Sequence, residues 1–384
     1  ATTLLVRTPV LQDGPYEGAE TLKLTAYNQS QWSLSTGTSG NSTIVDDGTG
    51  SIYLGNNNSS TPNAANDTDP NGPDYPAYLD DDRPVTVNSI VVNEASPYAV
   101  LTISGYNGQV LNLAWRDLTA KKDADSSGAA DGTDDYGPSL QYWDPAAGTG
   151  GDWVSYNGTS VTMSGSTLYV RTNVINDTPF EGLETFSLEV TKASSGAKVY
   201  GTVGIVDDGT GTKYPNDNPT DGVATDTSAL NDDRTITVTG GLTFNEGSPY
   251  ATFTVSGVAG AEINLILGNT SSNSDVDATI AGFTTSYSED GGVTWIDYTW
   301  NGTTGNRPTV PANGSGTSVY GTVLVRVNIA SEEEGGSDLY EGPETFTLTA
   351  NYATNNAITS TGADTIVDDG TGRIDRNGDG DTGD

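Results

Sequence analysis

The chain has 384 residues, with 51 Asp and Glu against 15 Lys and Arg, no histidine and no cysteine. The formal charge of −36 argues against a nucleic-acid partner, whose phosphates are bound by Lys and Arg. The missing residue types exclude Ser-His-Asp triads, cysteine nucleophiles, disulfides and zinc sites of the usual His/Cys kind. Hard cations held by oxygen ligands remain available as a source of rigidity.

Neither a membrane span nor a signal peptide is expected within this sequence. No apolar run approaches the roughly 18 to 20 residues that a spanning helix needs, and the stretch from Ala1 does not begin like a signal peptide. If the protein is exported, its targeting signal is expected outside this segment.

A short acidic motif occurs three times along the chain. It reads TIVDDGTG at 43–50, GIVDDGTG at 204–211 and TIVDDGTG at 365–372, and each copy begins 161 residues after the previous one. The preceding stretches also align, as in LLVRTPVLQDGPYEGAETLKLTA from Leu4 and LYVRTNVINDTPFEGLETFSLEV from Leu168. A period of this length matches a whole domain rather than a solenoid unit. The sequence therefore predicts separately folded tandem modules.

The repeats divide the chain into modules and linkers, and the chain reads as a window cut from a longer tandem array. The stretches between modules are rich in Asp, Asn, Pro and Thr and lack apolar periodicity. The predicted division is 1–50 as the C-terminal half of a module, 51–82 as a linker, 83–211 as a complete module, 212–231 as a linker, 232–372 as a complete module, and 373–384 as the start of the next linker.

The secondary structure is predicted to be all β. Short alternating runs such as TFSLEV and YATFTVSG are separated by Gly, Asn-Gly and Asp-Gly turns, and no helical period lasts longer than a turn. Short strands with regular turn signals are typical of two-sheet sandwiches. We expect tandem Greek-key β-sandwiches joined by Asp/Asn/Pro-rich linkers.

Residues two apart in a strand face the same side of a sheet. In several predicted strands, this parity makes the series of core-facing residues, a core-facing stripe, end in a carboxylate. Phe186, Leu188 and Val190 lead back to Glu184. The other stripes run from Val203 and Ile205 to Asp207, from Phe244 to Glu246, and from Val92 to Glu94. Unpaired carboxylates at the rim of a core are costly and repel one another, and Ca²⁺ would resolve both problems. The alternative is that these acids are solvated strand ends or surface charge.

The patterns EGLETFSLEV, GIVDDGTG and FNEGSPYATFTVSG together resemble the Calx-beta domain, found in sodium/calcium exchangers and in large bacterial surface proteins. The resemblance covers nearly the whole chain apart from the linkers. It implies a seven-stranded sandwich of immunoglobulin-like shape with Ca²⁺ bound by loops at one end.

The resemblance also implies a set of calcium ligands. They are Glu94 and Glu246 after the first strand, Asp177, Glu181, Glu184, Asp338, Glu341 and Glu344 around the penultimate strand, Asp207, Asp208, Asp368 and Asp369 after the last strand, the mid-module Asp135 and Asp277, and Asp13, Glu17, Glu20, Asp46 and Asp47 in the incomplete first copy. Exchanger domains carry a denser terminal cluster, so the number of ions per module stays open. Separately, Asp375, Asn377 and Asp379 repeat the start of an EF-hand loop.

The leading functional hypothesis is a calcium-stabilised structural array of a bacterial secreted or cell-surface adhesin or extracellular fibre, whose partners are neighbouring modules or identical chains. A calcium sensor, in which ion binding changes the angle between modules, is one alternative. A carbohydrate-binding repeat is another, favoured if Trp153 and Trp295 are exposed to stack on sugars and excluded if both are buried. No enzyme is expected, because acid pairs such as Glu341 and Glu344 recur in each repeat whereas a glycosidase needs one pair.

Overall fold

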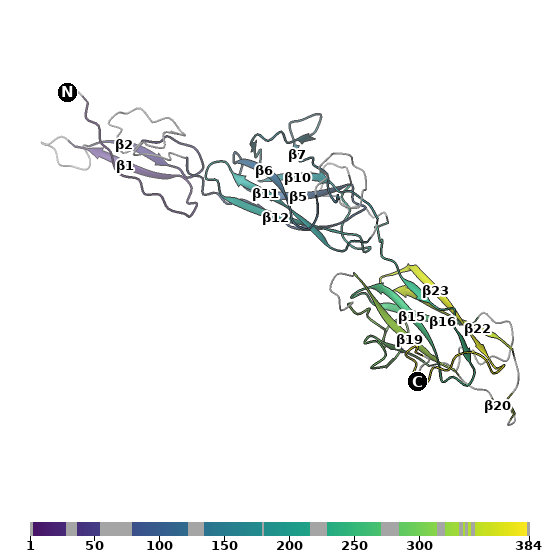
Figure 1. The fold of residues 1–384 in the computed structure, drawn as a ribbon. Helices are drawn as coiled ribbons and strands as arrows, with labels where there is room; N and C mark the ends of the chain where they lie inside the picture. Colours follow the sequence, from purple (N-terminus) through teal and green to yellow (C-terminus); the bar gives the residue numbers. More distant parts are fainter. Residues whose placement is uncertain are drawn as a thin grey trace, which may run out of the picture. The chain divides into compact units, whose positions relative to one another are not determined.

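The computed structural model describes residues 3–27, 37–53, 79–121, 134–178, 180–215, 229–269, 284–312, 319–329, 333–334, 337–338 and 342–381. Every regular element in these ranges is a β-strand (Figure 1), which confirms the all-β prediction. None of them holds a helix that is long and apolar enough to span a bilayer. The chain forms two compact units, Ala1–Asp177 with Leu183–Val206 and Gly211–Ala229, and Thr178–Gly182 with Asp207–Thr210 and Leu230–Asp384.

The N-terminal region contributes one antiparallel hairpin. Strand β1 (Glu20–Ala26) pairs with β2 (Thr38–Ile44), with Glu20 opposite Ile44 and Ala26 opposite Thr38. No described residue between 3 and 53 is buried. A two-stranded hairpin on its own is marginal in water.

Two five-stranded sheets form the first sandwich. One has the order β3 (Thr86–Val87), β5 (Tyr98–Ser104), β10 (Thr167–Asn173), β7 (Gln141–Asp144) and β8 (Asp152–Ser155). The other has the order β4 (Ile90–Asn93), β12 (Lys198–Val206), β11 (Glu184–Lys192), β6 (Val110–Asp117) and β9 (Val161–Thr162). Strand β4 runs parallel to the last strand β12, with Val92 opposite Ile205.

The resemblance implied seven strands, and the described part of this sandwich has ten. The first strand is split, so that β3 lies in one sheet and β4 in the other. The region between β6 and β10 forms three short strands in place of one. Both differences add strands at the sheet edges and leave the central order unchanged.

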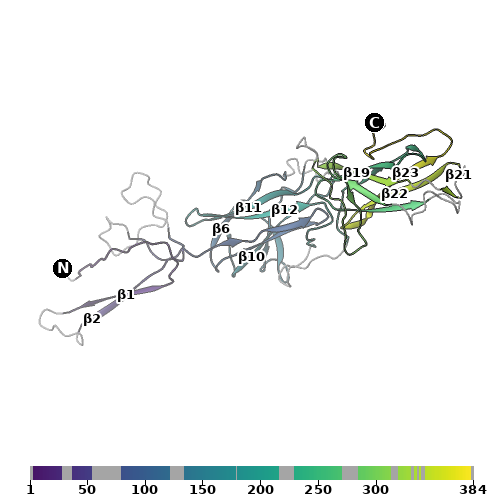
Figure 2. The ribbon, with the colours of Figure 1, turned by 90° about the horizontal axis from the view of Figure 1, so that it is seen from below.

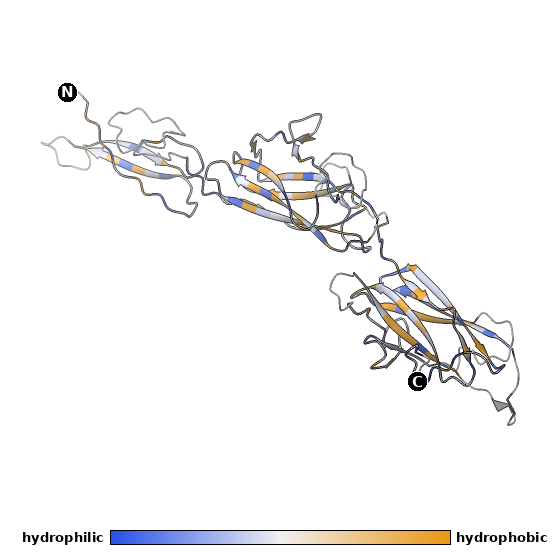
Figure 3. Ribbon diagram, viewed as in Figure 1, coloured by the Kyte–Doolittle hydropathy of each residue, from blue (hydrophilic) through white to orange (hydrophobic). Residues whose placement is uncertain are grey.

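Alternating side chains of the two sheets build the first core. Phe186, Leu188 and Val190 on β11 and Val203 on β12 are fully buried, as parity predicted. Tyr136 stacks on Phe186 with ring centroids 3.9 Å apart. Each fully buried side chain of this size contributes about 1.5–3 kcal/mol. The apolar segments coloured orange on these strands in Figure 3 follow this pattern.

The second sandwich has the same strand order, with one strand fewer in its second sheet. One sheet has the order β13 (Thr237–Thr239), β15 (Tyr250–Val258), β19 (Tyr320–Asn328), β17 (Thr285–Ser288) and β18 (Ile296–Asp297). The other has the order β14 (Thr243–Asn245), β23 (Asn355–Val367), β22 (Glu344–Tyr352) and β16 (Ile263–Asn269). Figure 2 shows the strands β19, β22 and β23 of this sandwich. Strands β20 (Glu333–Glu334) and β21 (Ser337–Asp338) form a separate short hairpin. The register also repeats, since Phe186 faces Val203 and Phe346 faces Asp364.

Candidate calcium site

Three acidic residues of the first sandwich follow or begin the strands that parity singled out. Glu94 comes directly after β4, Glu184 begins β11, and Asp207 comes directly after β12. The N–H of Glu94 donates to the carbonyl of Val206 at 2.8 Å, which ties the end of β4 to the end of β12. Glu94, Asp177 and Asp207 are all at least nine-tenths buried. Two of the four predicted stripes therefore end in a buried carboxylate, at Glu94 and Asp207, whereas Glu184 and Glu246 are half-buried.

One group of three carboxylates consists of Glu94, Asp207 and Asp233, each offering one oxygen within 4.8 Å of the others. Backbone donors orient two of them: the Asp177 N–H donates to Glu94 Oε1 at 2.9 Å, and the Glu181 N–H donates to Asp207 Oδ2 at 2.9 Å. The other oxygen of Asp207, Oδ1, is buried and has no hydrogen-bond partner among the described residues. This oxygen lacks the partner that buried polar atoms almost always have.

Burial raises the pKa of Asp207, and the neighbouring carboxylate of Asp233 raises it further. The Glu181 N–H opposes this rise by stabilising the ionised carboxylate. A nearby cation would favour the charged form in the same way, and more strongly.

A second group consists of Asp135, Glu181 and Glu184, again with one oxygen each within 4.8 Å of the others. Asp135 is 6% exposed, and its Oδ2 accepts from the Lys121 N–H. Its carbonyl accepts from the Ile175 N–H at 3.1 Å, which holds the mid-module segment against the end of β10. Asp135 was assigned by resemblance alone, and the structure places it with two of the loop glutamates.

Both groups suit a hard divalent cation. Ca²⁺ binds six to eight oxygens at 2.3–2.6 Å, so two oxygens on one ion lie at most about 5 Å apart. Three carboxylates this close repel one another without a cation. The donor set contains only oxygen, which matches Ca²⁺ or Mg²⁺ and not the softer metals that prefer sulfur or imidazole.

In each copy of the VDDGTG motif, the second aspartate accepts its hydrogen bonds within the turn itself. Asp47, Asp208 and Asp369 each accept a hydrogen bond from the N–H of the threonine two residues later, at 3.0, 3.0 and 2.9 Å. The threonine hydroxyl donates to the same oxygen in every copy. These three aspartates close the turn, and none belongs to either carboxylate group.

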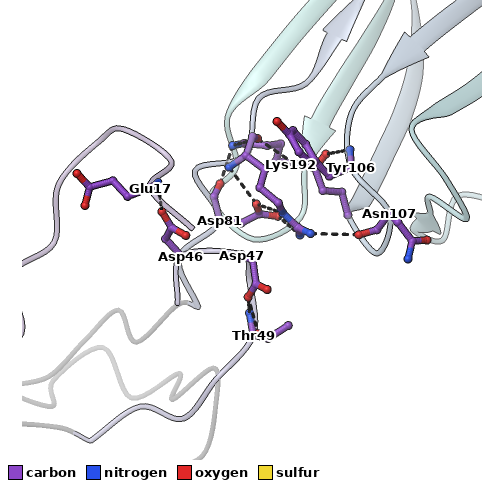
Figure 4. Close-up of polar contacts among 10 residues, drawn as sticks. Glu17, Asp46, Asp47, Thr49, Asp81, Tyr106, Asn107 and Lys192 are labelled. Atoms are coloured by element: carbon purple, nitrogen blue, oxygen red, sulfur yellow. Dashed lines mark hydrogen bonds and ion pairs between the residues drawn. The ribbon is translucent and has the colours of Figure 1, made fainter. Parts of the chain in front are cut away.

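The equivalent residues of the other two modules are only partly described. In the second sandwich Glu344 is 3% exposed, Glu246 and Asp368 are half-buried, and Asp369 is exposed. Asp277, Glu341 and the side chain of Asp338 lie outside the described residues. In the first copy Asp13, Glu17 and Glu20 are exposed and Asp46 is half-buried. Glu17 donates its N–H to Asp46 Oδ2 at 2.9 Å (Figure 4), as Glu181 does to Asp207.

The EF-hand-like stretch near the C-terminus is closed by its own hydrogen bonds. Asp375 is fully buried, and its Oδ1 accepts from the Gly378 N–H at 2.6 Å. Its Oδ2 accepts from the Gly380 N–H at 2.9 Å and from the Thr252 hydroxyl at 2.6 Å. Asn377 and Asp379 bond to each other, with Asn377 Nδ2 donating to Asp379 Oδ2 at 2.9 Å. The carboxylate of Asp375 therefore already accepts hydrogen bonds on both oxygens, unlike that of Asp207.

The two tryptophans that could stack on sugars are half-buried. Arg171 lies over the ring of Trp153 at 4.2 Å, and Arg326 lies over the ring of Trp295 at 4.2 Å. Each arginine also lies over a tyrosine ring, Tyr98 or Tyr250. A cation–π partner therefore covers one ring face of each tryptophan.

Sequence reasoning missed Asp233, which lies within the predicted module 232–372 and was not among the predicted ligands. A signal was present, because NDDR at 231–234 and DDDR at 80–83 precede the two complete modules in the same way. The pairing of these acids with the preceding VDDG motif depends on contacts between segments more than 20 residues apart, which the pattern alone did not reveal.

Similarity to known proteins is limited to weak structural likenesses. The CupB6 tip adhesin from Pseudomonas aeruginosa is 12% identical, with 74% of this chain and 98% of that chain covered and a TM-score of 0.21. Drosophila N-cadherin EC1-4 is 10% identical, with 75% and 49% covered and a TM-score of 0.28. The periplasmic chaperone SfaE is 10% identical, with 74% and 100% covered and a TM-score of 0.22. These values are too low to carry an argument about function.

No family model matches the chain, and no curated protein matches it. The Calx-beta resemblance therefore rests on the sequence motifs and stays a prediction.

Proposed function

We propose that this chain is a calcium-stabilised structural array of a secreted or cell-surface bacterial protein, an adhesin or an extracellular fibre. In this role Ca²⁺ neutralises the carboxylates at the end of each sandwich and stiffens the array. The proposal assigns no catalysis to the chain.

The observation that carries the proposal is the buried Oδ1 of Asp207. It has no hydrogen-bond partner among the described residues and lies in a group with two further carboxylates. A buried carboxylate oxygen without a partner destabilises the fold, and one bound cation would satisfy it together with the neighbouring carboxylates. The Asp135, Glu181 and Glu184 group supports the same reading. The repetition of the motifs favours a structural role, because a rigid array needs the same module many times.

Thermal unfolding of the full chain in EDTA and in increasing CaCl₂ tests this proposal. A ligand that binds only the folded form stabilises it by RT ln(1 + [L]/Kd), about 2.7 kcal/mol at a hundredfold excess over Kd. We expect the midpoint to rise with calcium, and Glu184→Gln and Asp207→Asn to reduce that rise. Asp144→Asn, in the hairpin between β7 and β8, is the matched control and should leave it unchanged.

The concentration at which the midpoint rises also separates two roles. Saturation at millimolar calcium fits an extracellular structural module, whereas saturation near micromolar calcium is the range of sensors. A midpoint that is the same in EDTA and in excess calcium would contradict the proposal and assign the acids to surface charge.

A further inference from the structure

Each of the first two VDDG turns holds the acidic segment that opens the following module. In the first unit, the Gly48 N–H donates to the carbonyl of Asp80 at 2.6 Å, and the Asp82 N–H donates to the carbonyl of Asp46 at 3.0 Å. In the second unit, the Gly209 N–H donates to Asn231 at 2.9 Å, and the Asp233 N–H donates to Asp207 at 2.9 Å. The two junctions thus have the same backbone pairing.

The same turn geometry recurs at both junctions. Gly48 and Gly209 have φ of +76° and +77°, where a side chain would be strained. A Cβ at Gly48 would also lie 3.3 Å from Asp81, and one at Gly209 would lie 2.9 Å from Asp232. Glycine therefore permits the acidic segment to approach the turn closely.

A buried ion pair fixes each acidic segment to its own module. Arg83 pairs with Asp81 at 2.8 Å, and Arg234 pairs with Asp232 at 2.6 Å. Figure 4 shows the first junction, where Asp81 lies beside Lys192 and Asn107 of the sandwich, while Asp46 and Asp47 lie on the turn. This leaves the last acid of each segment, Asp82 or Asp233, outside the ion pair, with its N–H bonded to the carbonyl of the first aspartate of the turn.

At the second junction that acid lies beside the carboxylate whose Oδ1 has no described partner. Asp233 and Asp207 each place a carboxylate oxygen within 4.8 Å of the other, and Asp207 Oδ1 is buried without a hydrogen bond among the described residues. At the other junction Asp46 Oδ1 is likewise buried and has no hydrogen bond in the described structure, but Asp46 as a whole is half-buried and the charge of Lys192 acts on Asp82. At the second junction, a cation would stabilise the two like charges of Asp207 and Asp233, which backbone hydrogen bonds bring together.

We infer that the calcium ion bound at Asp207 is shared with Asp233, so that calcium fastens the start of a module to the terminal turn of the module before it. This inference rests on the proposed calcium binding and adds that the ion is a junction ligand. Calcium would then control how tightly consecutive modules are joined, in addition to the stability of each sandwich.

Hydrogen–deuterium exchange of the full chain, measured by mass spectrometry in EDTA and in excess CaCl₂, tests this inference. The reporter is a peptide covering 229–236, which contains the Asp233 N–H. In the wild type we expect calcium to slow its exchange by up to about a hundredfold at a hundredfold excess over Kd. Asp233→Asn should lose this effect, while peptides of β11 keep their own calcium-dependent protection.

Two further variants make the result decisive. Asp232→Asn, which breaks the Arg234 pair, should speed exchange of the same peptide equally with and without calcium, because it acts through the ion pair. Asp144→Asn, the control variant of the unfolding experiment, should leave the calcium effect on the 229–236 peptide unchanged. Full calcium protection of 229–236 in Asp233→Asn would overturn the inference and confine the ion to one module. No calcium effect anywhere in the wild type would overturn the proposed function as well.

Discussion

The two sandwiches fill the same core position of their last strand with different residues. Val203 on β12 faces Phe186 and is fully buried, whereas Asp364 on β23 faces Phe346 and is 1% exposed. Both residues precede an inward isoleucine, Ile205 or Ile366, by two positions. One fold thus accepts either an apolar side chain or a carboxylate at this point.

Local backbone geometry explains how the second sandwich holds an acid in its core. The Leu242 N–H donates to Asp364 Oδ1 at 2.9 Å, and the Gly241 N–H also stabilises the carboxylate. Gly241 has φ of +91°, which opens the turn before β14. In the first sandwich the corresponding residue is Ser89, and its hydroxyl accepts from the Thr202 N–H at 3.1 Å. A buried acid is tolerated only where backbone donors point at it.

Placing an acid in the first sandwich should cause the largest loss of stability. Val203→Asp buries a carboxylate with no donors arranged for it, which we expect to cost on the order of 4–5 kcal/mol. Thr202→Asp is the matched control, because its side chain faces the other side of the strand. Denaturant unfolding followed by exchange of β11 and β12 peptides measures the difference. A loss below about 1 kcal/mol, the typical effect of a point mutation, would show that the core can rearrange to hold an acid.

Removing the buried acid Asp364 from the second sandwich should increase the stability of the fold at neutral pH. Burial raises the pKa of Asp364 from 3.8 to about 6. The folded state therefore holds a proton that the unfolded state releases, and stability falls as pH rises from about 4 to about 6. Above that range the ionised carboxylate costs about 3 kcal/mol. Asp364→Asn, which keeps an oxygen for Leu242, should be more stable than the wild type at pH 7 by up to this amount.

The pH dependence of that difference is the sharper measurement. Unfolding free energies of wild type and Asp364→Asn should converge as pH falls toward 4, because the wild-type carboxyl is then protonated in both states. Other acids titrate equally in both proteins, so the difference isolates Asp364. A difference that stays constant between pH 7 and pH 4 would indicate that the variant acts through packing rather than charge.

The sequence predicted those features that follow from strand parity. Buried Phe186, Leu188 and Val190 and the buried acids Glu94 and Asp207 were all expected from residues two apart, and the structure confirms them. The same parity places Asp364 inward, two residues before Ile366, but the tolerance of a core acid there depends on the N–H of Leu242. Likewise Asp233 joins Asp207 through pairing of distant segments. Long-range contacts of this kind are outside the reach of local pattern.

A second difference between the sandwiches lies at the end of the penultimate strand. Lys192 on β11 and Tyr352 on β22 occupy equivalent places, opposite Leu111 and Ile263. Lys192 Nζ donates to the carbonyls of Asp81 and Arg83 at 2.7 and 3.1 Å. The Tyr352 hydroxyl donates to the carbonyl of Thr235 at 2.7 Å and accepts from the Val258 N–H at 2.8 Å. Both side chains bind the first residues of their own module.

Substitutions at this pair should give the smallest effects, and the tyrosine should matter more than the lysine. Tyr352→Phe leaves a buried N–H and a carbonyl without their partner, at a cost of about 1–3 kcal/mol. Lys192→Met leaves only carbonyls near the module start, where Gln109 still donates to Arg83, so its cost should lie near 1 kcal/mol or below. Unfolding free energies of both variants check the order. A greater loss for Lys192→Met would mean that its charge, set among the acids of the first junction, contributes more than its hydrogen bonds.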